Sequence, residues 1–132
     1  MKQHGYGMAV STSLSPEAAE AQIRTALQEE GFGVLTEIDV AAVLKEKVGV
    51  EMGRYKILGA CNPDLASRAI SVEEDIGLLL PCNVVVYESG QRTVVAAMEP
   101  QTMVKLTSNP DLDDIAEDAR TRLDRALSAL PE

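Results

Sequence analysis

Two cysteines, each followed by an asparagine, are the residues of this chain best suited to chemistry. Cys61 lies in a Gly-Ala-Cys-Asn-Pro segment and Cys82 in a Leu-Pro-Cys-Asn-Val segment. A thiolate is a nucleophile and a ligand for soft metals, and an asparagine amide both donates and accepts hydrogen bonds. Cys61, Asn62, Cys82 and Asn83 are therefore the candidate ligand-binding residues.

The sequence leaves several interpretations of the two thiols open. Small buried cysteines are common, so both can simply fill tight core positions. Two thiolates alone can hold Cu(I), whereas a tetrahedral zinc site needs two further ligands. A cysteine nucleophile needs an activating group, and the single histidine, His4, lies next to the N-terminus.

We assign no catalytic residue, metal site or cofactor from these patterns, and they do not favour an enzyme. The favoured function is a ligand-binding or sensing module with a thiol site at Cys61 and Cys82, for a small molecule or a soft metal. The alternatives are a thiol-dependent enzyme and a soft-metal handling protein of the copper type.

Composition narrows the class of partner. A chain of 132 residues predicts a single domain over residues 1–132. The net charge of −9 and the 3% of aromatic residues argue against nucleic-acid binding, because phosphates need basic residues and single strands need stacking platforms. No apolar run has the length of a signal peptide or a membrane span, so we expect a cytoplasmic protein with no membrane contact. In that reducing compartment the cysteines are expected to be free thiols.

The first third of the chain predicts alternating strands and helices. Larger and small side chains alternate with a period of two residues, which indicates a strand over about residues 5–12. Cap residues predict a helix between Ser15 and Gly31, and a β-rich run over residues 32–38 predicts a second strand. A second helix is expected to begin at Asp39 and to end at Gly49. Its inward-facing residues are expected to be Val40, Val43 and Leu44.

The elements around the cysteines follow from turn residues. A strand over about residues 54–61 ends at Cys61, and the Asn62-Pro63 pair predicts a short helix over residues 63–71. Residues 72–77 contain three consecutive acids and are interpreted as a solvated surface turn. A hard cation is the alternative ligand for these acids, although the spacing of a calcium loop is absent.

The C-terminal part predicts a hairpin and a long helix. The run Val84–Val86, the turn Ser89-Gly90 and the run Thr93–Met98 predict two antiparallel strands. Asn109 and Pro110 predict the start of the last helix, whose apolar residues recur every three or four positions.

This order of elements predicts an α+β fold. We expect two layers, with a five-stranded antiparallel sheet and helices packed on one face. A doubly wound parallel sheet is the alternative, and the hairpin argues against it. If the strands around the cysteines are antiparallel neighbours, the two thiols meet at one rim, under the segment that joins them. The predicted walls of that pocket are Ile57, Ala60, Leu79 and Leu80.

The two hairpin strands are apolar at successive positions, which is typical of strands buried on both faces. Residues 84–86 and 94–98 are the runs concerned. One layer of helices covers only one face of the sheet. A homodimer that pairs through the open sheet face is therefore expected.

The segments Gly31–Val50, Tyr55–Pro63 and Asp75–Glu88 together resemble a bacterial and archaeal family known as domain of unknown function 302. The resemblance extends from about Gly31 to the last helix. It implies a small α+β domain, similar in outline to the TATA-binding-protein-like fold, that tends to form homodimers. It implies no known reaction.

Overall fold

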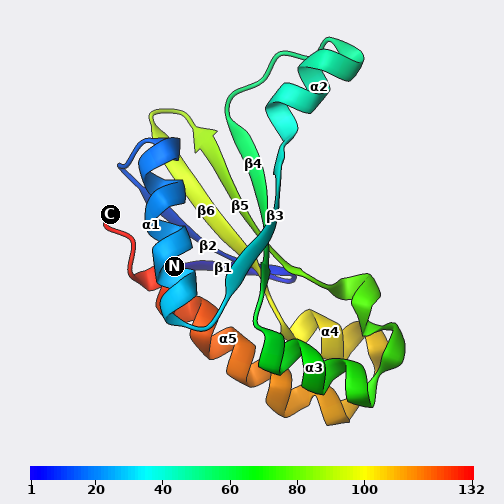
Figure 1. The fold of residues 1–132 in the computed structure, drawn as a ribbon. Coiled ribbons are helices and arrows are strands. Elements are labelled where there is room, and N and C mark those ends of the chain that lie inside the picture. Colours follow the sequence, from blue (N-terminus) through cyan, green and yellow to red (C-terminus); the bar gives the residue numbers. More distant parts are fainter.

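One antiparallel sheet of six strands forms the centre of the molecule (Figure 1). The computed structural model describes residues 1–132, and its sheet has the strand order β1-β2-β6-β5-β4-β3. All neighbouring strands in this order are antiparallel. The strands are β1 (Lys2–His4), β2 (Gly7–Thr12), β3 (Gly33–Asp39), β4 (Tyr55–Cys61), β5 (Cys82–Ser89) and β6 (Arg92–Met98).

Helices connect the strands and form the second layer. In Figure 1, α1 and α5 lie side by side against the sheet, while α3 and α4 gather at one of its ends. The helices are α1 (Pro16–Glu29), α2 (Val40–Val48), α3 (Pro63–Val72), α4 (Gln101–Thr107) and α5 (Asp113–Ser128), with short 3-10 helices η1 (Glu74–Leu79) and η2 (Pro110–Leu112).

Side-chain caps begin the helices where the sequence predicts them. Ser15 accepts a hydrogen bond from the Ala18 amide at the start of α1, and Asp39 accepts one from the Ala42 amide at the start of α2. Gly49 ends α2 in the left-handed conformation at φ 69°, which a glycine adopts without steric cost.

The pleat of each strand divides the sheet into a buried face and an open face. On β5 and β6, Val84, Val86, Val95 and Ala97 point into the core beneath α1 and α5 and are at most 2% exposed. The core forms one cluster of 24 buried residues, all of them aliphatic or Met except Phe32. The prediction of an α+β fold with one antiparallel sheet and helices on one side is confirmed.

Three elements differ from the expectation. The sheet has six strands because residues 2–4 pair with β2 through a turn at Gly5 and Tyr6. Residues 101–107 form α4, which has no side-chain cap to mark its start. The three acids are not in a turn: Glu73 precedes η1, whose first turn contains the other two.

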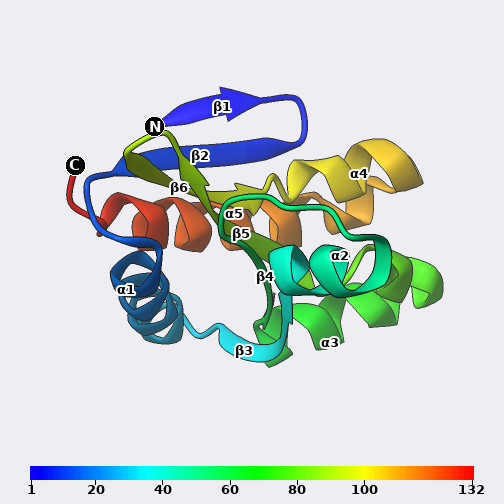
Figure 2. The same ribbon diagram turned by 90° about the horizontal axis from the view of Figure 1, so that it is seen from above.

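Helix α2 is the largest departure from the predicted packing. None of its residues is buried, and Val43 is 43% exposed. It lies beyond the end of the sheet on β3 and β4, and Figure 2 shows α1 and α2 on opposite sides of β4. The expected inward face of this helix is not buried: Val40 and Leu44 are only half-buried, because α2 contacts little of its own chain besides β4.

The longest helix, α5, has 16 residues. None of the helices has the length and the apolar character that crossing a membrane requires.

Candidate functional site

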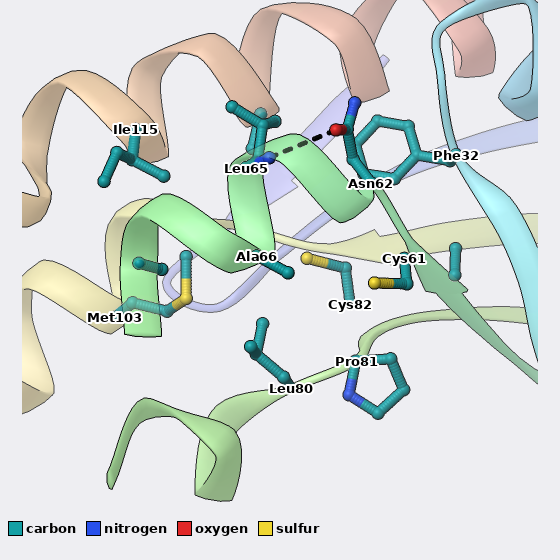
Figure 3. Close-up of a pocket in the computed structure, with 13 residues that line it drawn as sticks. Phe32, Cys61, Asn62, Leu65, Ala66, Leu80, Pro81, Cys82, Met103 and Ile115 are labelled. Atoms are coloured by element: carbon teal, nitrogen blue, oxygen red, sulfur yellow. Dashed lines mark hydrogen bonds between the residues drawn. The ribbon is translucent and has the colours of Figure 1, made fainter. Parts of the chain in front are cut away.

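The pairing of β4 with β5 brings the two cysteines together. Cys61 ends β4, Cys82 begins β5, and the neighbouring Ala60 is the register partner of Cys82. Paired Cα atoms in an antiparallel ladder are about 4.5–5.5 Å apart, and consecutive Cα atoms about 3.8 Å. The Cα atoms of Cys61 and Cys82 therefore lie less than about 9.5 Å apart. Figure 3 shows their sulfur atoms side by side.

Both thiols line a small cavity between the end of the sheet and the helices. Its volume is about 30 Å³, and 11 of its 13 lining residues are hydrophobic. A cavity of this size holds about one or two water-sized groups. The apolar walls come from five parts of the chain: Phe32 before β3, Leu65 on α3, Leu80 after η1, Met103 on α4 and Ile115 on α5.

Asn62 lies at this cavity and also begins the helix that covers it. Its side-chain oxygen accepts a hydrogen bond from the Leu65 amide at 3.2 Å, and its amide nitrogen donates to the Glu30 carbonyl at 3.5 Å. The side chain thus joins the start of α3 to the end of α1. Because both ends of this amide have partners, its first role is to hold α3 over the thiols.

Asn83 does not share the cavity with the other three candidate residues. Successive side chains on a strand point to opposite faces, so Cys82 points into the core and Asn83 lies exposed on the open face. Ile57 is on the open face for the same reason. The predicted walls Ala60 and Leu80 do line the cavity, whereas Ile57 and Leu79 do not.

Pro81 closes the side of the cavity next to Cys82, after a cis peptide bond from Leu80. Its ring lies against the backbone of Gly59 on the neighbouring strand. A Cβ atom at Gly59 would lie 2.9 Å from Pro81 Cγ and would also collide with the Thr36 hydroxyl. Glycine is therefore required for this close approach.

The electrostatic surroundings keep Cys82 protonated. Burial, with a smaller contribution from the neighbouring Cys61, raises the pKa of the Cys82 thiol to about 11. Cys61 is half-buried, and both cysteines are free thiols. No Lys, Arg, His, Asp or Glu is among the residues that line the cavity.

His4 is not placed to activate either thiol. It lies on β1, at the far edge of the sheet, where its ring meets Tyr6 at 4.4 Å between centroids. His4 lines a different hollow on the open face, together with Asn83 and the stacked pair Tyr55 and Tyr87.

Met103, Phe32 and Ile115 are lining residues that sequence reasoning missed. They are far from both cysteines in the chain and reach the cavity only through the packing of α4, β3 and α5. The signal for α4 was weak, because its seven residues are too few for a clear helical period.

Comparison with known proteins agrees with this architecture. No curated protein matches the chain. Among solved structures, the crystal structure of an uncharacterised conserved DUF302 protein from Bacillus stearothermophilus is similar, with a TM-score of 0.87 and 31% sequence identity. The match covers 92% of this chain and 95% of that one. The model of the family described as "Domain of unknown function DUF302" matches residues 8–130. The chain therefore belongs to the DUF302 family.

Proposed function

We propose that this domain is a ligand-binding module that holds one soft monovalent cation, of the Cu(I) type, between Cys61 and Cys82. The observation that carries the proposal is the pair of free thiols side by side at a cavity with otherwise apolar walls. Soft sulfur ligands select Cu(I).

The size of the cavity supports an ion over an organic ligand. Organic ligand pockets have volumes of about 300–1,000 Å³, whereas this cavity has about 30 Å³. A single ion fits this space and a small organic molecule does not. The structure contains no cluster of three or more His, Cys, Asp or Glu residues suited to a metal. A cation that accepts two sulfur ligands therefore fits better than zinc, which takes four.

The electrostatics of the site also favour a cation over catalysis. A thiol with a pKa of about 11 is almost entirely protonated near neutral pH, and the protonated form is a poor nucleophile. A bound monocation offsets the repulsion between the two neighbouring thiolates, so it allows both groups to ionise. The thiol-dependent enzyme is therefore the less supported alternative.

A titration of the reduced protein with Cu(I), in competition with a chromophoric Cu(I) chelator, tests the proposal. One equivalent of copper per chain is expected. Zn²⁺ in a parallel titration is expected to remain with a zinc chelator of moderate affinity. Complete retention of Cu(I) by a weak chelator would overturn the proposal.

We also propose that the domain works as a homodimer through the open face of the sheet. Ile57, Val85 and Ala96 form an apolar row across β4, β5 and β6 on that face, opposite the face that α1 and α5 cover. A second copy would cover this surface. Free thiols are typical of a reducing compartment, so we propose a cytoplasmic location.

Sedimentation equilibrium at micromolar concentration tests the homodimer. The chain has a mass of 14.2 kDa, and we expect twice that mass. Val85→Lys, which adds a charge at the centre of the apolar row, is expected to shift the equilibrium toward monomer. A monomeric wild-type chain would contradict the proposed dimer.

A further inference from the structure

The hollow that His4 lines on the open face of the sheet, here called the open-face hollow, is far larger than the thiol cavity. Its volume is about 440 Å³, whereas the cavity at Cys61 and Cys82 has about 30 Å³. Pockets for organic ligands have volumes of about 300–1,000 Å³. The open-face hollow therefore has room for a small organic molecule. The two cavities share no lining residue.

Ring side chains gather at this hollow from distant parts of the chain. The chain has three tyrosines and one histidine, and all four of these residues line the hollow. Tyr55 and Tyr87 are register partners on β4 and β5, and their rings stack at 5.3 Å between centroids. Tyr6, which is 72% exposed, meets His4 at the edge of the sheet. Aromatic rings attract a planar aromatic ligand through offset or edge-to-face contacts.

Small residues make the floor of the hollow between these rings. Ala96 lies on β6, between the strands that carry the two groups of rings. Gly7 on β2 is the register partner of His4. A Cβ atom at Gly7 would lie 2.5 Å from Cε1 of His4, so the absence of a side chain lets the imidazole lie directly on β2. The depth of the hollow follows from small residues between large ones.

The polar groups at the hollow can orient a ligand without a charge. The Asn83 amide is exposed there and offers both a donor and an acceptor. No Lys, Arg, Asp or Glu is among the lining residues. A charged ligand would lose hydration in the hollow without gaining a partner of opposite charge. The lining therefore favours a neutral ligand.

Thr102 on α4 supplies a second polar group, and its hydroxyl is unused in the folded chain. Its oxygen is the one buried side-chain oxygen or nitrogen of the molecule that has no hydrogen-bond partner. Buried polar atoms are normally paired. Threonine side chains occupy alternative staggered positions about χ1, so this hydroxyl can turn toward the hollow and pair with a ligand without giving up an existing hydrogen bond.

We propose that the open-face hollow binds a neutral, planar heteroaromatic molecule with fused rings, held by the tyrosine and histidine rings and oriented by Asn83 and Thr102. The inference is independent of the copper site, which lies in the other cavity. It is also independent of the proposed homodimer, because one chain supplies every lining residue. The hollow shares Val85 and Ala96 with the apolar row, so a second copy and the ligand would compete for this face.

Quenching of tyrosine fluorescence tests the site, because every tyrosine of the chain lines the hollow and the chain has no tryptophan. Riboflavin is the probe, since it has a neutral planar ring system with several hydrogen-bonding groups. We expect saturable quenching with one riboflavin per chain. Free N-acetyltyrosinamide corrects for light absorbed by the probe. The protein is kept at the lowest concentration that the signal allows, where a second copy competes least.

Flavin mononucleotide, which carries the same rings and a phosphate, tests the preference for a neutral ligand. The chain has a net charge of −9, and no basic residue lines the hollow. Flavin mononucleotide is therefore expected to bind at least about threefold more weakly than riboflavin at low salt.

Three variants test the residues that we assign to the site. Tyr87→Leu, which removes a ring, is expected to lower the affinity for riboflavin at least about fivefold. Asn83→Ala and Thr102→Val each remove one hydrogen bond to the ligand and are expected to lower it about 2–10-fold. Thr102→Val is also expected to keep the stability of the free protein, because the lost hydroxyl has no partner there. The control Thr121→Ala, on exposed α5 surface, is expected to keep the wild-type affinity.

The possible failures are distinct from those of the copper site and the homodimer, which the copper titration and sedimentation measure. Absence of saturable quenching by riboflavin would overturn the open-face site and leave the other two proposals standing. Riboflavin binding that Tyr87→Leu and Asn83→Ala both leave unchanged would overturn it as well. Tighter binding of flavin mononucleotide than of riboflavin would contradict the neutral ligand.

Discussion

Replacing Leu123 with alanine is expected to lower the free energy of unfolding by about 2–5 kcal/mol. Leu123 is completely buried at the centre of the apolar side of α5, which packs on α1, β2 and β6. Its truncation removes apolar contact with both layers and leaves a cavity that rigid neighbours fill only in part. Urea unfolding followed by circular dichroism, at a fixed protein concentration because of the proposed dimer, measures the change.

Thr121→Ala is the matched control on the same helix. Thr121 is exposed, and its hydroxyl donates only to the Glu117 carbonyl one turn earlier. Its replacement is expected to change stability by less than about 0.5 kcal/mol. Arg122, also outside the apolar side, is unsuitable, because it donates to the Glu30 carbonyl at the end of α1. Equal losses for Leu123→Ala and Thr121→Ala would mean that α5 does not pack as described.

Replacing either cysteine with serine is expected to lower the affinity for Cu(I) by at least about 100-fold. Loss of a residue that only supports a metal ligand lowers metal affinity by about 10–100-fold. Loss of one of the two ligands themselves should lower it by at least as much. A serine hydroxyl is a hard oxygen donor that keeps the size of the side chain but not its preference for soft metals. The chelator competition described above measures both Cys61→Ser and Cys82→Ser.

Asn83→Ala is the control for this comparison. Asn83 follows Cys82 directly but lies on the opposite face of the sheet, so the affinity for Cu(I) is expected to stay within about twofold of wild type. Unchanged copper affinity in both cysteine variants would exclude the two-thiol site.

Local signals in the sequence predicted most of the fold. Ser15, Asp39 and Asn62 each begin a helix by accepting a backbone hydrogen bond, and this chemistry depends on neighbours only three residues away. The strand β1 was not predicted, because its three residues are too few to show a strand pattern and its pairing with β2 depends on the turn that follows it. Of the inward face predicted for α2, Val40 and Leu44 are only half-buried and Val43 is exposed, because an apolar pattern shows which side of a helix favours burial and not how much of the chain packs against it.

The candidate site was predictable only where sequence order determines geometry. Antiparallel pairing of β4 with β5 places the end of one strand beside the start of the other, so the meeting of Cys61 and Cys82 followed from the predicted order. The placement of Asn83 with them ignored the alternation of side chains along β5. Met103 and Ile115 complete the cavity through contacts between distant helices, which no local pattern contains.

The X-ray absorption spectrum of the Cu(I)-loaded protein tests the two-thiol site most directly, because it counts the atoms bound to copper. We expect two sulfur neighbours per copper and no nitrogen neighbour, and one sulfur fewer after Cys61→Ser. A copper ion surrounded by nitrogen or oxygen atoms, or a spectrum that both cysteine replacements leave unchanged, would contradict binding between Cys61 and Cys82.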